Sequence, residues 1–276
     1  METSSTVFYA NNLTDILYQL KNVSRVELCA GCTTFQQLPP IALIIRNVEE
    51  LKFIDKRERF VDFGASVPLS VILDLGQKRL PSFFYEAVKS IANPFIRNMA
   101  TIGGNICRTD VRGTLYAPLL ASDASLDFRT ANEVITIPMT KFFGIPKGGF
   151  LTKIRLPLEE WDISVFRQLN PVLRLNENSA SFVFLAKTEK GILLKIRIAL
   201  CGLIRFRSGD LESRLLSSKL PLSKKTIEEI LELAGNKFDK EANEFMLTTD
   251  RDYSQTLFIL RVKFLNVLKY SLYLLT

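Results

Sequence analysis

The sequence contains no histidine among its 276 residues, and this absence removes several classes of chemistry. Ser-His-Asp and Cys-His catalysis, zinc held by histidine, and the most common general base in enzymes all require an imidazole. Any reaction at this protein must therefore depend on other side chains or on a bound cofactor.

Cysteine is also scarce, with four residues: Cys29, Cys32, Cys107 and Cys201. The first two form a Cys-x-x-Cys pair, but no second close pair follows, so neither structural zinc nor an iron–sulfur cluster is indicated. A redox dithiol is an alternative, although the thioredoxin-like context of such pairs is missing. We expect buried or incidental thiols and a reducing compartment.

Long apolar runs are missing as well. The start, Met-Glu-Thr-Ser-Ser, has neither the basic nor the apolar region of a signal peptide. The strongly apolar stretch 253–275 is interrupted by Arg261, Lys263 and Lys269, which favours a core-packing helix over a membrane helix. We expect a cytoplasmic protein with no membrane span.

The charge is mildly basic, with 36 Lys and Arg against 29 acidic residues and no long block of one sign. A slightly basic surface explains this balance, and a docking face for an acidic partner protein is an alternative. The 20 Phe and seven Tyr could stack nucleic-acid bases, but most of them lie in apolar runs that are typical of a core. We therefore expect no nucleic-acid partner.

The apolar pattern predicts alternating strands and helices in the first part of the chain. Strands are expected at 26–29, 41–45 and 59–65, with an early helix capped by Asn12 or Thr14 and another beginning at Pro68. Further on, a helix is expected at 83–91 and strands at 134–138 and 150–157. After residue 160, the pattern predicts an antiparallel pair, 181–186 and 193–201, and a helix over 223–238 capped by Ser223.

Two segments are candidates for ligand binding. The first, 30–35 (AGCTTF), follows an apolar strand, and small residues there can turn backbone N–H groups into a nest for phosphate. Thr33 and Thr34 add hydroxyl groups. The second is 101–105 (TIGGN), where Gly103 and Gly104 permit positive φ and a close approach of the backbone to a ligand. A structural turn and a plain loop between strands are the respective alternatives.

The second segment carries a family resemblance. Residues 96–105 (IRNMATIGGN) resemble the hallmark of the FAD-binding subunit of the molybdenum hydroxylases, the family of xanthine dehydrogenase and aerobic carbon monoxide dehydrogenase. Upstream, 30–33 (AGCT) resembles the family's Ala-Gly-Gly-Thr turn, and 64–69 (GASVPL) resembles its Gly-Ala-x-x-x-Leu segment. Residues 151–157 (LTKIRLP) are similar to the strand that closes the flavin domain.

The resemblance implies an α+β fold of the vanillyl-alcohol oxidase/MurB type, followed by a small α+β domain. The FAD-binding domain would span 1–160, with subdomains of about 1–55 and 56–160, and the C-terminal domain 161–276. Arg167 would be a cation near the flavin or, alternatively, a solvated strand residue. The cofactor-binding residues implied are Ala30, Gly31, Cys32, Thr33, Thr34, Phe35, Thr101, Ile102, Gly103, Gly104, Asn105, Arg108, Leu151 and Arg167.

By the same resemblance, this chain would be an oxidoreductase subunit in a hetero-oligomer. Electrons from a molybdenum cofactor and iron–sulfur clusters on partner subunits would reach FAD here and leave to NAD or another acceptor. The chain departs from the family pattern at Cys32, in place of a glycine, and at Thr114, in place of an aspartate. Arg108 and Arg112 would then supply charge to the pyrophosphate, or the fold would serve as a flavin-free scaffold subunit.

Overall fold

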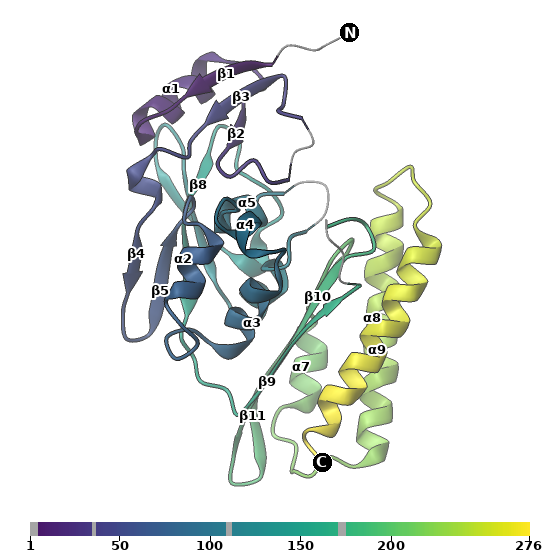
Figure 1. Cartoon of the computed structure of the whole chain (residues 1–276). Coiled ribbons are helices and arrows are strands. Elements are labelled where there is room, and N and C mark those ends of the chain that lie inside the picture. The colour runs from purple at the N-terminus through teal and green to yellow at the C-terminus, as the bar shows by residue number, and fades with distance from the viewer. Residues whose placement is uncertain (1–4, 35–36, 109–111, 171–174) are drawn as a thin grey trace. The chain divides into compact units, whose positions relative to one another are not determined.

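The computed structural model describes residues 5–34, 37–108, 112–170 and 175–276. The chain divides into two compact units (Figure 1). The first consists of residues 1–80, 91–109 and 123–158, and the second of residues 81–90, 110–122 and 159–276. Two short segments that precede residue 160 therefore belong to the second unit, whereas the linear division at 160 placed them in the first.

The first unit begins with a small parallel sheet, as the sequence predicts for the first 55 residues. Its strands are β1 (Thr6–Tyr9), β3 (Ile41–Ile44) and β2 (Glu27–Cys29), in that order. Helix α1 (Leu13–Asn22) connects β1 to β2, and the side chain of Asn12 caps it by accepting a hydrogen bond from the N–H of Asp15 at 2.9 Å. Ile16 and Leu43 lie in the core beneath this sheet.

A five-stranded antiparallel sheet completes the first unit. Its order is β4-β5-β8-β6-β7. Asp62 of β5 is buried and receives two hydrogen bonds from Arg155 of β8, at 2.8 and 2.7 Å, which fix the register of these two strands. The strands are β4 (Ile54–Lys56), β5 (Phe60–Gly64), β6 (Ser125–Arg129), β7 (Val134–Pro138) and β8 (Phe150–Pro157).

Short helices follow the strands of the first unit. Helices this short are not stable by themselves, so packing against the rest of the protein must stabilise them. These helices are η1 (Glu49–Leu51), α2 (Leu69–Asp74), α4 (Pro94–Arg97), α5 (Ile102–Ile106) and η2 (Met139–Lys141).

The second unit contains a four-stranded antiparallel sheet covered by helices on both faces. The sheet order is β12-β11-β10-β9. The strands are β9 (Ile163–Leu169), β10 (Ala180–Glu189), β11 (Ile192–Cys201) and β12 (Arg205–Phe206). The helices are α3 (Ser82–Ser90), α6 (Tyr116–Ala121), α7 (Gly209–Leu215), α8 (Lys224–Met246) and α9 (Ser254–Tyr273).

Burial along β10 explains why the second unit needs α3 and α6. Seven consecutive residues, 180–186, are buried, so both faces of this strand are covered. Phe182 and Phe184 point into the core formed with α8 and α9, where Phe264 packs against Phe182, Phe206 and Phe238. Helix α6 packs against β10 and β11, and α3 packs against β9. The residues of β10 that alternate with the phenylalanines therefore meet α6.

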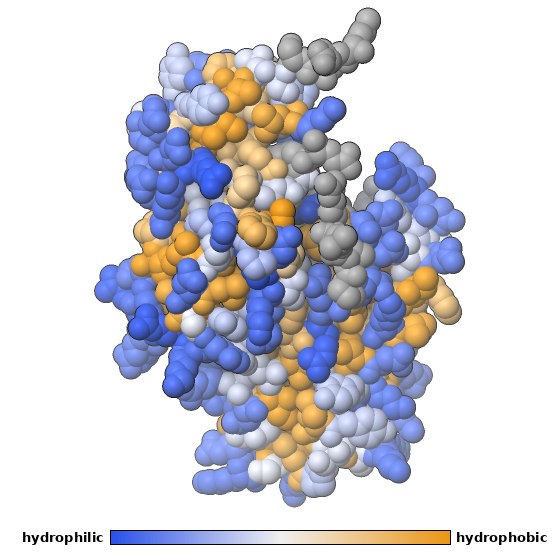
Figure 2. Space-filling model, viewed as in Figure 1, coloured by the Kyte–Doolittle hydropathy of each residue, from blue (hydrophilic) through white to orange (hydrophobic). Residues whose placement is uncertain are grey.

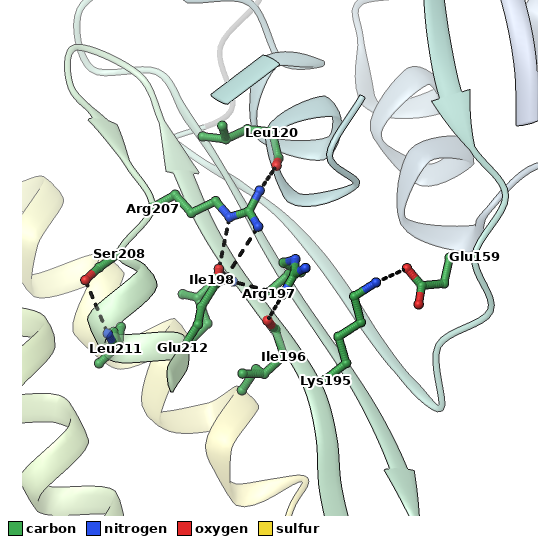
Figure 3. A network of polar contacts seen from close by, with 10 residues as sticks. All are labelled: Leu120, Glu159, Lys195, Ile196, Arg197, Ile198, Arg207, Ser208, Leu211 and Glu212. Carbon is green, nitrogen blue, oxygen red and sulfur yellow. Dashed lines mark hydrogen bonds and ion pairs between the residues drawn. The ribbon is translucent and has the colours of Figure 1, made fainter. Parts of the chain in front are cut away.

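A buried ionic network holds the second unit together (Figure 3). Glu212 of α7 accepts hydrogen bonds from the N–H of Ile198 and from Nε of Arg207, both at 3.1 Å, and pairs with Arg197 at 3.5 Å. Arg207 also donates to the carbonyl oxygen of Leu120 at 2.5 Å. The network thereby attaches α6 to the sheet.

The C-terminal helices bear on the predictions made from the sequence. Ser223 caps α8 as predicted, but the helix continues to Met246 rather than ending near 238. Helix α9 packs against α8, β9 and β10, and its Leu260, Phe264 and Leu268 are buried, in line with the predicted core helix. Within the described ranges, no helix is long and apolar enough to cross a membrane.

Candidate functional site

The turn after β2 packs tightly against another backbone segment. Gly31 is buried, and a Cβ atom built on it would lie 2.0 Å from the carbonyl oxygen of Met99 and 2.7 Å from its carbonyl carbon. Backbone atoms cannot move aside as a flexible side chain can, so glycine is required at this position. The turn is thereby fixed against the segment that leads into α5.

The same turn offers unpaired backbone donors. Among the described residues, the N–H groups of residues 31–34 donate no hydrogen bond. Cys32 has a φ of 53°, in the left-handed region, and a left-handed residue within a turn is a feature of backbone nests that bind anions. Thr33 is half-buried and Thr34 is exposed beside these donors. The arrangement is suited to an anion such as a phosphate.

The segment Thr101–Asn105 is a short helix, neither a loop between strands nor a positive-φ turn. Neither Gly103 nor Gly104 has positive φ, so the conformational reason that we gave for these glycines is wrong. A Cβ on Gly103 would lie 2.6 Å from the carbonyl oxygen of Ala65 and 2.9 Å from its Cβ. Gly103 is therefore needed for close packing within the protein.

Gly104 has a different environment. It is the exposed residue of α5, whose other members are buried, and the one atom within 4 Å of a Cβ on it is Oγ1 of Thr101, at 3.0 Å. Its Cα therefore faces open space and presents bare backbone at the surface. Asn105, the next residue, is buried. Of the two glycines, Gly104 is the one that a ligand can approach.

The start of α5 is held by the segment 64–69. Ile102 donates its N–H to the carbonyl oxygen of Val67 at 3.1 Å, and Gly103 donates to that of Ala65 at 2.9 Å. Thr101 caps the helix, because its Oγ1 accepts a hydrogen bond from the N–H of Gly104 at 3.1 Å. The first three N–H groups of α5 thus have acceptors inside the protein. Within the described ranges, the donors without an acceptor lie on the turn 31–34 instead.

The structure therefore brings three sequence motifs together in the first unit: the turn 30–34, the segment 64–69 and the helix-forming segment 100–105. Sequence reasoning did not single out Ser66 as part of this site. Its hydroxyl is buried in the middle motif and has no hydrogen-bond partner in the part of the chain that the structure describes. A buried hydroxyl without a partner is unusual, and no sequence pattern marks it.

The remaining predicted residues are in other environments. Arg108 is half-buried beyond the end of α5, and Leu151 is buried in β8 opposite Phe128 of β6. Arg167 belongs to the second unit, where it is exposed, donates to the carbonyl oxygen of Phe166 at 2.8 Å and lies over the ring of Tyr270 at 5.8 Å. Phe35 lies outside the described residues.

Arg112, which we expected as an additional source of charge, has partners in the second unit. Its Nη1 donates to the carbonyl oxygens of Gly202 and Leu203 at 3.2 and 2.7 Å. Its guanidinium group also lies 5.7 Å from the ring centre of Tyr116. These contacts give Arg112 a structural role that does not require a pyrophosphate.

All four cysteines are free thiols. Burial raises the pKa of Cys29 to about 12, and a hydrogen bond with the neighbouring thiol of Cys32 adds to the shift. Burial likewise raises the pKa of both Cys107 and Cys201 to about 12. Among the described residues, no group of three or more His, Cys, Asp or Glu could hold a metal ion. Cys29, Cys107 and Cys201 are therefore protonated at neutral pH and are poor nucleophiles.

Comparison with known proteins identifies relatives of this chain. The chain is 27% identical over 164 residues to an indole-3-acetaldehyde oxidase of Zea mays, covering 55% of this chain but 12% of that protein. It is 26% identical over 193 residues to the glyceraldehyde dehydrogenase medium chain of Sulfolobus acidocaldarius, covering 66% and 68%. The chain thus spans a small part of the first relative and about two thirds of the second.

A solved structure shares the fold. A chain of the carbon monoxide dehydrogenase from Hydrogenophaga pseudoflava matches with a TM-score of 0.79 and 20% identity, over 96% of this chain and 95% of that one. The model of the family described as FAD binding domain in molybdopterin dehydrogenase matches residues 3–159, which is more than half of the chain. The chain is therefore of mixed α+β class and belongs to the family of FAD-binding domains of molybdopterin dehydrogenases.

Proposed function

We propose that this chain is the FAD-binding electron-transfer subunit of a molybdenum hydroxylase complex. Electrons would enter from iron–sulfur clusters on a partner subunit and leave to NAD or another acceptor. The observation that carries the proposal is the row of backbone N–H groups at residues 31–34, which have no acceptor among the described residues. They lie on a turn fixed against the segment that leads into α5, within the region that matches the family model.

The residues present fit a dinucleotide cofactor. The donors of the turn 31–34 are backbone amides, which bind the pyrophosphate oxygens that such a cofactor carries. Gly104 leaves open space where a larger residue would place a side chain, so the backbone of α5 can be approached closely. When bound, FAD would supply the redox chemistry, and the protein would supply binding and orientation.

In this proposal, each motif has a separate role. Gly31 and Gly103 hold the two cofactor-facing segments together, because each is packed against the backbone of another segment. Thr101 fixes the start of α5, and the turn 31–34 holds the negative charge. Arg108, Leu151 and Arg167 remain proposed cofactor contacts, the first by charge, the second by apolar contact and the third as a cation near the flavin.

The partners in the proposal are a subunit with the molybdenum cofactor and a subunit with iron–sulfur clusters. Support comes from the relative in Sulfolobus acidocaldarius, which is named a medium chain, and from the carbon monoxide dehydrogenase chain of the same fold. An outer-sphere electron transfer needs no acid–base residue in this chain, which agrees with the lack of histidine.

A second candidate function is a flavin-free scaffold subunit of the same type of complex. Two observations favour it. Arg112 is held by carbonyl oxygens of the second unit, and the first N–H groups of α5 already have acceptors within the protein. A cofactor would then have fewer charged and polar contacts than the motif alone suggests.

The visible absorption spectrum of the purified full chain separates the two functions. One equivalent of FAD, recovered from the supernatant after heat denaturation and identified by chromatography, is the result expected for the electron-transfer subunit. A chain that stays colourless with added FAD, both alone and with its partner subunits, would refute the flavoprotein proposal and support the scaffold.

A further inference from the structure

The outward face of α9 carries a row of apolar side chains. Phe258, Ile259, Val262, Tyr270 and Tyr273 are exposed by 66, 40, 42, 52 and 43% respectively, and we call this set the α9 stripe. Successive members are one, three, eight and three residues apart, so at about 3.6 residues per turn they all lie within about a third of the helix circumference. Hydrophobic surface is visible at the right of Figure 2, where Figure 1 draws α9.

Helix α8 beside it behaves as an ordinary surface helix. Its buried residues include Ile227, Ile230 and Phe238, whereas its outward residues are mainly Glu, Lys and Asn. Helix α9 instead buries Leu260, Phe264 and Leu268 and is also apolar on the opposite side. Asn266 and Lys269 interrupt this side, but most of its outward residues are apolar. A surface helix normally turns polar residues outward, so an apolar outward face is expected to be covered in an assembly.

The stripe is comparable in area to the largest apolar patch of a typical monomeric protein. If each fully exposed side chain offers about 200 Å², the stripe amounts to roughly 500 Å². The largest patch on a monomer is about 300–600 Å² and is often functional. Its composition points the same way, because Tyr, Phe and Arg are enriched in the centres of protein interfaces. Arg167 supplies the arginine, since its guanidinium lies over the ring of Tyr270.

The charged side chains of α9 itself are all basic. Helix α9 carries Arg261, Lys263 and Lys269 and no acidic residue. Arg261 is paired with Asp239 at 2.7 Å, and Lys263 is bound to Asn170. Lys269 is exposed and has no ion-pair partner within the described part of the chain. Together with Arg167, it leaves a cationic rim along the stripe.

We propose that the α9 stripe is the docking surface for a protein partner that presents an apolar ridge flanked by carboxylates. A second copy of this chain would bring the same cations against one another, which disfavours a symmetric pairing. An acidic partner places carboxylates against Lys269 and Arg167 and apolar side chains against Val262 and Tyr273. That this partner is another subunit of the complex rests on the proposed function.

The test uses two valines with the same exposure. The full chain is co-expressed with the two partner subunits, and the affinity for the partners is measured by sedimentation and by titration of the purified chains. Val262→Glu is compared with Val71→Glu on α2, since both valines are helical and both are 42% exposed. We expect Val262→Glu to weaken assembly at least 100-fold and Val71→Glu to change it less than twofold.

A second variant tests the charge separately from the apolar contact. Lys269→Glu is expected to weaken assembly at least tenfold and to reduce the loss of affinity caused by added salt. Because this side chain is exposed, circular dichroism and the melting temperature should stay unchanged. Equal assembly of the wild type and both α9 variants would overturn the proposal.

Other occupants give different results. A wild-type chain that dimerises alone, and becomes monomeric with Val262→Glu, would show a second copy on the stripe and refute the acidic partner. Co-sedimentation with phosphatidylglycerol vesicles that Val262→Glu abolishes would show a membrane surface, with the same consequence. The FAD content of every preparation is measured as well. If the α9 variants lose assembly but the wild-type chain holds no FAD, electron transfer is refuted and the docking surface is retained. If the chain holds FAD and the α9 variants assemble normally, the docking surface alone is refuted.

Discussion

Replacing Gly104 by alanine separates the stability of the first unit from its capacity to hold a cofactor. Gly104 lies inside α5, is exposed and has negative φ, so alanine fits the backbone. A Cβ there meets Oγ1 of Thr101 at 3.0 Å, a contact that a small shift of the hydroxyl relieves. The added methyl group otherwise points into the space that we assign to FAD.

The variant is expected to raise or preserve folding stability and to lower the affinity for FAD. Alanine is favoured over glycine within a helix by about 0.8–1.0 kcal/mol, so folding should be unchanged or stabilised. For a chain of this size, that corresponds to a rise in Tm of about 2–4 °C. Forcing a methyl group into a closely packed contact costs about 1–3 kcal/mol, which is an approximately 5- to 150-fold loss of FAD affinity.

The assay measures both quantities on one preparation. Thermal unfolding of the apoprotein gives Tm, and titration of the apoprotein with FAD, followed by the change in flavin fluorescence, gives Kd. Gly144→Ala is the matched control, since a Cβ on Gly144 meets no atom within 4 Å and its φ is not positive. It should leave both quantities close to those of the wild type.

The outcome is also compared with Gly103→Ala. That variant should lower Tm, because its Cβ would lie 2.6 Å from the carbonyl oxygen of Ala65. If Gly104→Ala binds FAD within twofold of the wild type, the cofactor does not approach α5 at this residue. If Gly104→Ala lowers Tm as much as Gly103→Ala does, the two glycines share a structural role and the reasoning is refuted.

Three further predictions concern stability and reactivity. Glu212→Gln should lower the free energy of urea unfolding by about 3 kcal/mol, because it removes the buried carboxylate that pairs with the half-buried guanidinium groups of Arg197 and Arg207. Glu244→Gln, in an exposed pair, should change it by less than about 0.5 kcal/mol, and equal effects would contradict the network. Cys32, which is half-buried, should react with a maleimide before the buried Cys201, and added FAD should slow that reaction; mass spectrometry of labelled peptides would show the opposite order if the turn were closed. Hydrogen bonds donated by the backbone N–H and the hydroxyl of Thr188 hold the pKa of Asp162 below its usual value. This carboxylate therefore stabilises the fold above the pKa of the unfolded chain, about 3.9, and the contribution is lost as pH falls through the lower folded pKa. Asp162→Asn should cost stability at pH 6 and have no effect on stability in strong acid, as urea unfolding at several pH values would show.

Much of the secondary structure follows from local pattern. Strands 134–138 and 150–157 have the predicted bounds, and the Lys190-Gly191 turn joins the predicted hairpin with both residues at positive φ. These elements alternate apolar and polar residues or carry turn residues at fixed positions, so their signals are local. Helix α8 was predicted too short, because its last turns are polar and exposed, and Asp239 there is paired with Arg261 of α9.

Sequence motifs defined the candidate site, but its geometry could not be predicted from them. The short helix α5 depends on acceptors at Ala65 and Val67, 35 or more residues away, and no local pattern reports such partners. The purpose of Gly103 depends on the same contact with Ala65. Cys32 stands where the family pattern has a glycine, and the turn places it in the left-handed region, which non-glycine residues rarely occupy.

The composition of the second unit was harder to predict than its strands. Ser181–Ala186 forms a continuous apolar run, which is typical of a strand buried on both faces. That run implied a second covering layer, but nothing in the sequence after residue 160 indicated that the layer is made by 81–90 and 110–122. Proximity along the chain favoured assigning these helices to the first domain.

The origin of α3 and α6 limits how this protein can be divided or recombined. A gene fragment that encodes only residues 159–276 would lack the helix that covers β10 and the carbonyl group of Leu120 that Arg207 binds. Such a fragment is not expected to fold as an independent unit, although it contains every strand of its sheet. Recombination that joins the first unit of one protein to the four-stranded sheet of another must therefore keep α3 and α6 matched to that sheet.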